Sequence, residues 1–202
     1  LTPDSFPYPT ASAPSNLSRM ISIRARLERD RLRIKYAAGT AGRERLWAAQ
    51  TDLTRSLDEL PTHWQYMDQL YQLLQPLDGG VALLDVGCGI HSFARLLLLN
   101  LSYRLRAQTW NQNQPLRYIG IDFSVAALHA AQDATSDALK HVDRLFSGRI
   151  SGPTPVSQQW VLGRSVEMLP FADHSFDRIV ANLSLNFSRS PLHTLRELFR
   201  VL

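Results

Sequence analysis

The sequence predicts an α/β domain built on a parallel sheet and preceded by a helical region. The first observation is a change after Gly80, where short apolar runs begin to alternate with helical stretches, as in strand-helix units around a parallel sheet. The second is a pair of glycines, Gly87 and Gly89, just after the first of these apolar runs. The third is composition, because 202 residues of which 45% are hydrophobic and 20% charged suffice for one domain with an ordinary core.

Composition also excludes several classes of protein. Collagen-like, disulfide-scaffold and wholly disordered chains have other compositions. The longest unbroken apolar runs are far shorter than the roughly 20 residues of a membrane-spanning helix, so we expect a soluble chain with no transmembrane segment. The single cysteine, Cys88, cannot form an internal disulfide or supply a multi-thiolate zinc site, and it favours a cytoplasmic location.

The first 80 residues divide into a leader and a helical region. Residues 1–15 hold four of the eleven prolines and show no periodicity, which predicts a flexible, Pro-rich leader. Residues 16–80 have apolar residues at helical spacing and are expected to form helices over about 16–38, 43–60 and 63–74.

Positive charge gathers in the first of these helices. The whole chain carries +4, whereas residues 19–35 contain seven basic and two acidic residues, a net +5, so the remainder sums to −1. Such a helix could bind a phosphate backbone, an anionic membrane surface or an acidic partner. We favour a solvated amphipathic helix that caps the domain with its apolar face, since no aromatic stacking platform lies beside the charges.

Residues 81–202 are predicted to alternate strands with helices. Strands are expected at 81–86, 118–121, 160–162 and 178–182, and helices at 91–101, 125–143 and 192–202. Two long connections remain, 102–117 and 146–159, and loops of that length in a compact domain are usually functional or mobile.

The strongest local signal is the segment LLDVGCGIH, which runs from Leu83 to His91. An apolar strand ends at Asp85, two glycines follow, and a helix then begins. Glycines at such a turn let the backbone approach a ligand closely, and the helix N-terminus beyond them offers unpaired N–H groups. The pattern favours a ligand site over a tight turn with no ligand.

A second signal lies at the end of the next expected strand, which reads YIGID and ends in Asp122. A carboxylate at the tip of the second parallel strand lies beside the first glycine turn and can accept both hydroxyls of a ribose. The alternative is an aspartate that caps the following helix. With the glycine turn in place, we favour the ribose.

The third signal is the segment from Gly163 to Phe187, GRSVEMLPFADHSFDRIVANLSLNF. Its Glu167, Leu-Pro-Phe at 169–171 and Ser-Phe-Asp at 175–177 before an apolar strand resemble the stretch after the third strand of class I S-adenosylmethionine-dependent methyltransferases, especially those that act on small molecules and quinones. The resemblance covers about residues 81–202. It implies a Rossmann-like three-layer α/β sandwich, methyltransferase activity and S-adenosyl-L-methionine as cofactor.

The resemblance also implies a set of cofactor-binding residues at the ends of the four strands: Asp85, Gly87, Cys88, Gly89, Asp122, Phe123, Ser165, Val166, Glu167, Asn182 and Leu183. By this resemblance Asp85 orients the glycine turn and the methionine end of the cofactor. Asp122 takes the ribose hydroxyls, and Phe123 packs on the adenine.

The later strand ends complete the implied site. Residues 165–167 would contact the adenine edge, and Asn182 and Leu183 would lie near the transferring methyl group. Methyl transfer from a sulfonium requires no metal, and the family fold gives no fixed general base, so no catalytic residue is assigned. The expected acceptor is a small molecule. Asp173 and Asp177 are interpreted as turn and strand-edge residues.

Three positions depart from the family pattern. His91 stands where a third glycine is most common, so its side chain must turn outward or crowd the cofactor. Ser165 stands where an aspartate commonly receives the exocyclic amine of adenine, and a neutral serine accepts that bond more weakly. Asn186 stands where the family often has a histidine.

Three alternatives remain open. A nicotinamide-dependent oxidoreductase would usually carry a three-glycine fingerprint, which this chain lacks. A non-catalytic cofactor-binding or regulatory module is compatible with the departures at His91 and Ser165. A nucleic-acid methyltransferase would use the arginine-rich helix at 19–35, and its binding would depend steeply on salt.

The family sheet has seven strands, of which this sequence supplies four. We therefore expect residues 81–202 to form a partial methyltransferase domain whose fourth strand lies at an exposed edge. The sequence is accordingly interpreted as a fragment, or the ordered part, of a longer protein.

Overall fold

The structure, a computed structural model, describes residues 18–19, 21–23, 25, 42, 60–90, 92–106, 114–145, 156–163, 165–182 and 184–202, with the backbone alone at 92, 101–106, 141–145, 186 and 187. The predicted leader, most of the two helices predicted before residue 60, and the centres of the two long connections lie outside the described residues.

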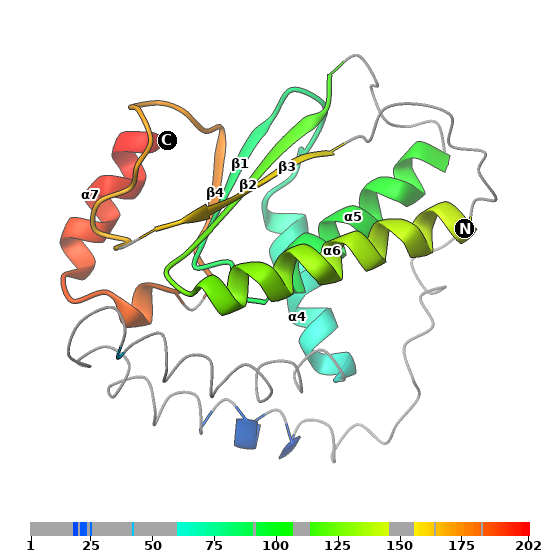
Figure 1. Cartoon of the computed structure of the whole chain (residues 1–202), viewed down its shortest axis with the longest axis horizontal. Helices are drawn as coiled ribbons and strands as arrows, with labels where there is room; N and C mark the ends of the chain where they lie inside the picture. The colour runs from blue at the N-terminus through cyan, green and yellow to red at the C-terminus, as the bar shows by residue number, and fades with distance from the viewer. Residues whose placement is uncertain are drawn as a thin grey trace.

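A four-stranded parallel sheet forms the centre of the described part of the chain (Figure 1). Its strands are β1 (Ala82–Val86), β2 (Leu116–Asp122), β3 (Val156–Leu162) and β4 (Arg178–Val180), in the order β3-β2-β1-β4. Every residue of β1 is buried, as expected for a parallel strand with both faces covered. Among the described residues β4 pairs with β1 alone, so the fourth strand forms an edge of the sheet, as predicted.

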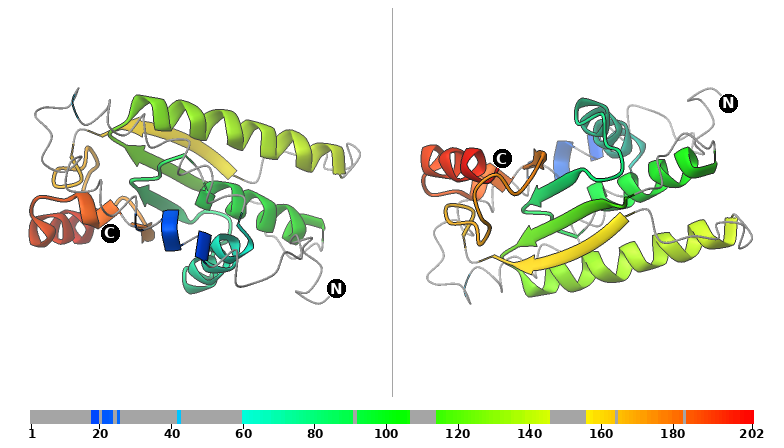
Figure 2. Two further views of the ribbon diagram at one scale, coloured as in Figure 1. Left: turned by 90° about the horizontal axis from the view of Figure 1, so that it is seen from below. Right: turned by 90° about the horizontal axis from the view of Figure 1, so that it is seen from above.

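Helices and a long loop cover the two faces of the sheet (Figure 2). The helices are α4 (Pro61–Leu73), α5 (Ser92–Arg106), α6 (Val125–Leu145) and α7 (Pro191–Val201), with a short 3-10 helix, η2 (Ser184–Phe187), before α7. Leu83 and Tyr118 of the sheet pack with α4, α5 and α6 on one face. Leu84 packs with Phe176 and with Val201 of α7 on the other. This arrangement confirms the predicted three-layer α/β sandwich.

The element bounds differ from the predictions in places where polar residues interrupt the apolar pattern. β3 begins at Val156 rather than at residue 160, and the added residues include Ser157, Gln158 and Gln159. Within the described sheet β3 pairs only with β2, and an edge strand tolerates polar side chains that a central strand does not. α5 also extends through residue 106, into a stretch predicted to be a connection. None of the described helices combines the length and apolarity that a membrane crossing needs.

Candidate functional site

The site lies at the carboxyl ends of the parallel strands, where the glycine turn follows β1. Gly87 and Gly89 have φ angles of +69° and +57°, in the left-handed region that glycine adopts without steric cost. The backbone N–H groups of Gly87 and Cys88 both donate to the carbonyl oxygen of Ile121, at 2.8 and 3.2 Å. The turn after β1 is therefore fixed to the end of β2.

Asp122 binds this same turn with its side chain. One carboxylate oxygen, Oδ2, accepts a hydrogen bond from the N–H of Gly89 at 3.0 Å, and the other, Oδ1, accepts one from the N–H of Ser124 at 2.9 Å. The aspartate is buried, with 5% of its surface exposed. The structure thus brings the acid predicted to bind ribose into direct contact with the predicted glycine turn.

Asp85 is also buried, and it lies within β1, before the glycine turn begins. The hydroxyl of Tyr118 on β2 donates to its Oδ2 at 2.7 Å. Burial raises the pKa of Asp85 to about 7, the bond from Tyr118 opposes that rise, and the charge of Asp122 adds to it. Burial and the nearby acids likewise raise the pKa of the Cys88 thiol, which disfavours the nucleophilic thiolate.

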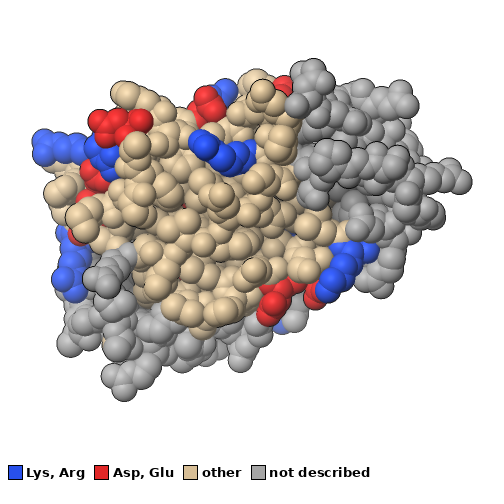
Figure 3. All heavy atoms as spheres, turned by 45° about the horizontal axis from the view of Figure 1, so that its top comes forward, with Lys and Arg blue, Asp and Glu red and all other residues tan. Residues whose placement is uncertain are grey.

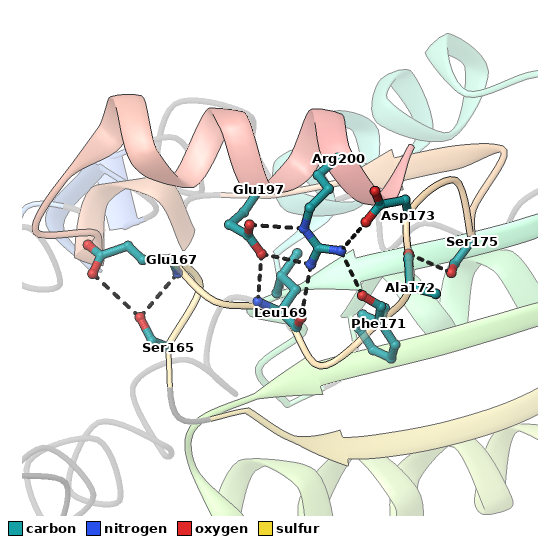
Figure 4. Close-up of polar contacts among 9 residues, drawn as sticks. All are labelled: Ser165, Glu167, Leu169, Phe171, Ala172, Asp173, Ser175, Glu197 and Arg200. Carbon is teal, nitrogen blue, oxygen red and sulfur yellow. Dashed lines mark hydrogen bonds and ion pairs between the residues drawn. The ribbon is translucent and has the colours of Figure 1, made fainter.

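The segment after β3 is anchored to the residues that precede α7. The hydroxyl of Ser165 accepts a hydrogen bond from the N–H of Glu167 at 3.1 Å (Figure 4). The Glu167 carboxylate accepts bonds from the hydroxyl of Ser188 at 3.0 Å and from the N–H groups of Arg189 and Ser190 at 2.6 and 2.8 Å. Glu167 therefore connects this segment to the start of α7, a role that the sequence did not predict. Val166 beside it packs half-buried against the apolar cluster under α7.

Replacing Glu167 by alanine is expected to loosen this connection. Partial burial raises the pKa of Glu167, but the bonds from Ser190, Ser188 and Arg189 outweigh it and lower the pKa below its ordinary value. Because the folded pKa is lowered, the stabilisation is present at neutral pH and is lost as pH falls below about 4. We expect Glu167→Ala to lower the free energy of unfolding by about 1–3 kcal/mol at pH 7 and by less at pH 3.5, measured by urea denaturation. An equal loss at both pH values would contradict this role.

A second network holds the loop at 169–173 against α7. Arg200 pairs with Glu197 at 2.9 Å and with Asp173 at 2.8 Å, and it donates to the carbonyl oxygen of Phe171 at 2.9 Å (Figure 4). Asp177 accepts a bond from the N–H of Ala82 at 2.8 Å, at the opposite end of β1 from the glycine turn. Asp173 and Asp177 thus make the structural contacts expected of turn and strand-edge residues.

The end of β4 joins the site to the N-terminal helical region. Tyr66 of α4 donates from its hydroxyl to Oδ1 of Asn182 at 2.8 Å, and Nδ2 of Asn182 lies 3.8 Å from the sulfur of Met67. Asn182 is one of the predicted site residues, and Phe123 lies half-buried after β2. The predicted residue Leu183, together with His91 and the side chain of Asn186, lies outside the described residues.

Ser184, to which the sequence analysis assigned no role, also lies beside the glycine turn. It begins η2, and a Cβ built on Gly87 would lie only 2.3 Å from the Cβ of Ser184. Its side chain is buried, and its Oγ has no hydrogen-bond partner within the described structure. No sequence pattern distinguishes it, because a serine two residues after Asn182 matches no motif.

These features fit a nucleoside ligand. A Cβ on Gly89 would meet no atom of the described residues within 4 Å, so the outer side of the turn has open space. Around it lie the carboxylate of Asp122, which suits ribose hydroxyls, and the orphaned hydroxyl of Ser184. The residues present are therefore compatible with S-adenosylmethionine.

Comparison with known proteins places the chain among methyltransferases. A family model described as a methyltransferase domain matches residues 84–202, more than half of the chain. The chain is similar to the SpnF [4+2]-cyclase, with 24% identity and a TM-score of 0.54 over 82% of this chain and 57% of that one. It is also similar to a Methanococcus maripaludis protein described as an S-adenosyl-L-methionine-dependent methyltransferase, with 19% identity and a TM-score of 0.52 over 79% and 58% of the two chains.

The solved structures support the fold, and the family model supports membership. The chain spans 58% and 57% of the length of these two structures. A third similar structure is YcgJ from Bacillus subtilis, with 20% identity and a TM-score of 0.46. That match covers 67% of this chain and 45% of YcgJ. Comparison with curated proteins found no match. The chain belongs to the methyltransferase domain family, in agreement with its resemblance to the class I methyltransferases, whose cofactor is S-adenosylmethionine.

Proposed function

We propose that this protein transfers a methyl group from S-adenosylmethionine to a small-molecule acceptor. The observation that carries the proposal is the bond between the Asp122 carboxylate and the N–H of Gly89, beside open space on the glycine turn. A glycine turn and an acid at adjacent strand ends suit a nucleoside cofactor whose ribose lies over β2. The family membership supports the same reaction.

The residue roles follow the order of the strand ends. Asp122 accepts bonds from the ribose hydroxyls, and Phe123 packs on the adenine. Ser165 and the backbone of 165–167 contact the adenine edge, since the Glu167 carboxylate binds the 188–190 segment instead. Asn182 and Leu183 border the methyl group. The backbone of Gly87, Cys88 and Gly89 lines the cofactor. Buried Asp85, in the strand before them, orients the turn.

Bound S-adenosylmethionine supplies an electrophilic methyl group on a sulfonium. The protein's part is to align that methyl group with the acceptor and to keep water out, because in-line displacement depends on positioning. Asn182 is well suited to positioning, since Tyr66 fixes its amide at 2.8 Å. No side chain in the described site is assigned as a general base.

The acceptor side is proposed to involve the helical region at 16–80, in front of the methyltransferase domain at 81–202. Its helix α4 contributes Tyr66 and Met67, both of which contact Asn182 at the end of β4. A helix that touches a residue beside the methyl group can shape a pocket for a small acceptor. This contact is what favours a small molecule over a nucleic acid.

The first experiment is a calorimetric titration with S-adenosylmethionine, S-adenosylhomocysteine and NAD. We expect the first two to bind with micromolar dissociation constants and NAD not to bind. Binding of NAD alone would replace the proposal with a nicotinamide-dependent enzyme. Cofactor binding without methyl transfer to any acceptor in a chemically diverse panel would instead favour a non-catalytic module.

Two alanine substitutions in the glycine turn separate folding from binding. Gly87→Ala should lower the free energy of unfolding by about 3 kcal/mol, because it combines a left-handed φ with a Cβ pressed on Ser184. Gly89→Ala should cost only about 1 kcal/mol, because its φ is also left-handed but its Cβ meets open space. The methyl group added by Gly89→Ala would occupy the cofactor's position, so S-adenosylhomocysteine should bind at least ten-fold more weakly. Unchanged affinity in this variant would contradict a cofactor on the turn.

The nucleic-acid alternative depends on residues 19–35, most of which lie outside the described residues. On the face drawn in Figure 3, Lys and Arg are dispersed toward the edges and lie among acidic residues, with uncharged side chains across the centre. A polyanion would find little continuous basic surface on this described face. RNA or DNA binding that weakens steeply with salt and on charge reversal at Arg24 and Arg31 would favour the alternative.

A further inference from the structure

We propose that the carboxylate of Asp85 makes the site prefer the positively charged cofactor to the product that remains after methyl transfer. S-adenosylmethionine carries the positive charge of a sulfonium, and S-adenosylhomocysteine has the same shape apart from the methyl group but lacks that charge. The proposal rests on the function proposed above. It gives Asp85 a role beyond orienting the turn, namely selection between two ligands that differ chiefly in charge.

Buried negative charge is concentrated at the glycine turn. Asp85 is 3% exposed and Asp122 is 5% exposed. Asp85 stands in β1 two residues before Gly87, and Asp122 reaches the turn from β2 through its bond to the N–H of Gly89. Both acids act on the thiol of Cys88 between the two glycines and raise its pKa. Two carboxylates thus act on the turn on which the cofactor is proposed to lie.

The charge of Asp85 is not balanced by a cation in the described part of the chain. Tyr118 contributes a neutral hydroxyl, which donates to Oδ2 of Asp85 at 2.7 Å. Asp85 belongs to no ion pair among the described residues. The charged side chain that acts most on it is Asp122, which is itself negative. A ligand that brings positive charge to the turn therefore meets an uncompensated carboxylate.

The basic side chains on the neighbouring elements have other partners. The guanidinium of Arg95 on α5 lies 5.3 Å from the ring centroid of Trp64. The ring of His63 on α4 packs edge-on against the same tryptophan at 6.1 Å. Arg178, at the start of β4, donates to the preceding carbonyl oxygen in an exposed position. These contacts leave the field at Asp85 to its burial, to Tyr118 and to Asp122.

A buried carboxylate acts on a ligand without contacting it. Two residues of extended chain span at most about 7 Å, so a ligand on the turn at Gly87 lies close to Asp85. Opposite unit charges about 10 Å apart, at an effective dielectric constant of about 20, attract strongly enough to change a dissociation constant on the order of ten-fold. The sulfonium of the cofactor gains this attraction, and the neutral sulfur of the product does not.

The preference should depend on pH, because Asp85 attracts a cation only when it is ionised. Burial raises its pKa to about 7, the Tyr118 bond opposes that rise, and the charge of Asp122 adds to it. A cationic ligand favours the carboxylate and so lowers this pKa in the complex. The preference for the cofactor is therefore weak in acid, rises with pH, and levels off from about pH 7 upward, where the free protein is already ionised.

Calorimetry with both ligands from about pH 5.5 to pH 8 tests the proposal. In the wild type, the dissociation constant of S-adenosylhomocysteine divided by that of S-adenosylmethionine should rise about ten-fold and level off near pH 7. Asp85→Asn cannot ionise but still accepts the Tyr118 bond, so its ratio should stay near the wild-type value in acid. The ligands' own groups titrate alike in both proteins, so the difference isolates Asp85. Asp133→Asn, at an exposed position of α6, is the matched control and should keep the wild-type profile.

Tyr118→Phe provides a readout that a purely structural role would not move. The ring still packs against Trp160, whereas the bond that lowers the pKa of Asp85 is lost. The rise in the ratio should therefore move to higher pH by on the order of one unit. An unshifted rise would assign the titration to another group and overturn the proposal.

The outcomes separate this proposal from the proposed function. If wild-type protein binds neither ligand, the proposed function itself is wrong. If it binds both with a ratio that does not change with pH, or if the ratio follows the same course in Asp85→Asn, only the role of Asp85 is wrong.

Discussion

Asp122→Asn is expected to abolish most of the affinity for S-adenosylmethionine while leaving a folded protein. A hydrogen bond to a charged acceptor contributes about 1.5–3 kcal/mol, so loss of the carboxylate charge toward the ribose hydroxyls should weaken binding about 100-fold. The side chain also holds two backbone N–H groups, those of Gly89 and Ser124. An asparagine has only one oxygen, so one of these N–H groups would face an NH2 group instead.

Calorimetry and thermal denaturation together measure this effect. The loss of one backbone bond should lower the free energy of unfolding by about 1–3 kcal/mol, so the affinity is measured well below the variant's thermal midpoint. Asp133→Asn, on an exposed position of α6, provides the matched control and should change neither quantity. A folded Asp122→Asn protein with wild-type affinity would show that the acid is only a turn residue.

The glycine turn and Asp122 could be predicted because their requirements are local. Positive φ angles need glycine, and the ends of parallel strands meet at one edge of a sheet, so neighbouring sequence motifs suffice. Both the order of the elements and their approximate bounds follow from apolar periodicity in the same way. β3 was predicted too short because Gln158 and Gln159 break that periodicity, and only the sheet order places them on an edge strand.

The contacts that join distant segments could not be predicted. Glu167 matches a family motif, yet its carboxylate binds the 188–190 segment across irregular backbone whose path no sequence pattern specifies. The bond between Tyr66 and Asn182 joins residues that are 116 positions apart in the chain. That the Ser184 hydroxyl is buried without a hydrogen-bond partner among the described residues could likewise be seen only in the folded structure.

Tyr118 illustrates the same limit inside a regular element. β1 and β2 pair with Leu83 opposite Tyr118 and Asp85 opposite Gly120, so Asp85 and Tyr118 are diagonal neighbours on one face of the sheet. A shift of the register by one residue would move the tyrosine to the other face. The partner of Asp85, and with it the balance of effects on its pKa, therefore depends on a register that the sequence leaves open.

The contribution of the buried Asp85 to the free energy of unfolding should fall as pH rises. Burial, reinforced by the charge of Asp122 and opposed by the Tyr118 bond, raises its pKa from 3.8 to about 7. Because the folded pKa lies above the unfolded one, the folded protein holds a proton that the unfolded chain releases between about pH 4 and pH 7. The contribution of Asp85 to the free energy of unfolding is greatest below pH 4, declines through this window by on the order of 4 kcal/mol, and is constant above it.

The difference in stability between Asp85→Asn and the wild type isolates this contribution. Asparagine is isosteric with the protonated acid and can still accept the Tyr118 hydroxyl bond, so the two proteins should be similarly stable near pH 4.5. From there to about pH 7 the variant should become progressively more stable than the wild type, and the difference should then stay constant to pH 8, measured by urea denaturation at a series of pH values. Asp133→Asn controls for an exposed aspartate on α6, and its difference from the wild type should not follow this course. A difference between Asp85→Asn and wild type that stays constant with pH would mean that Asp85 is charged throughout, with its charge compensated in the folded protein.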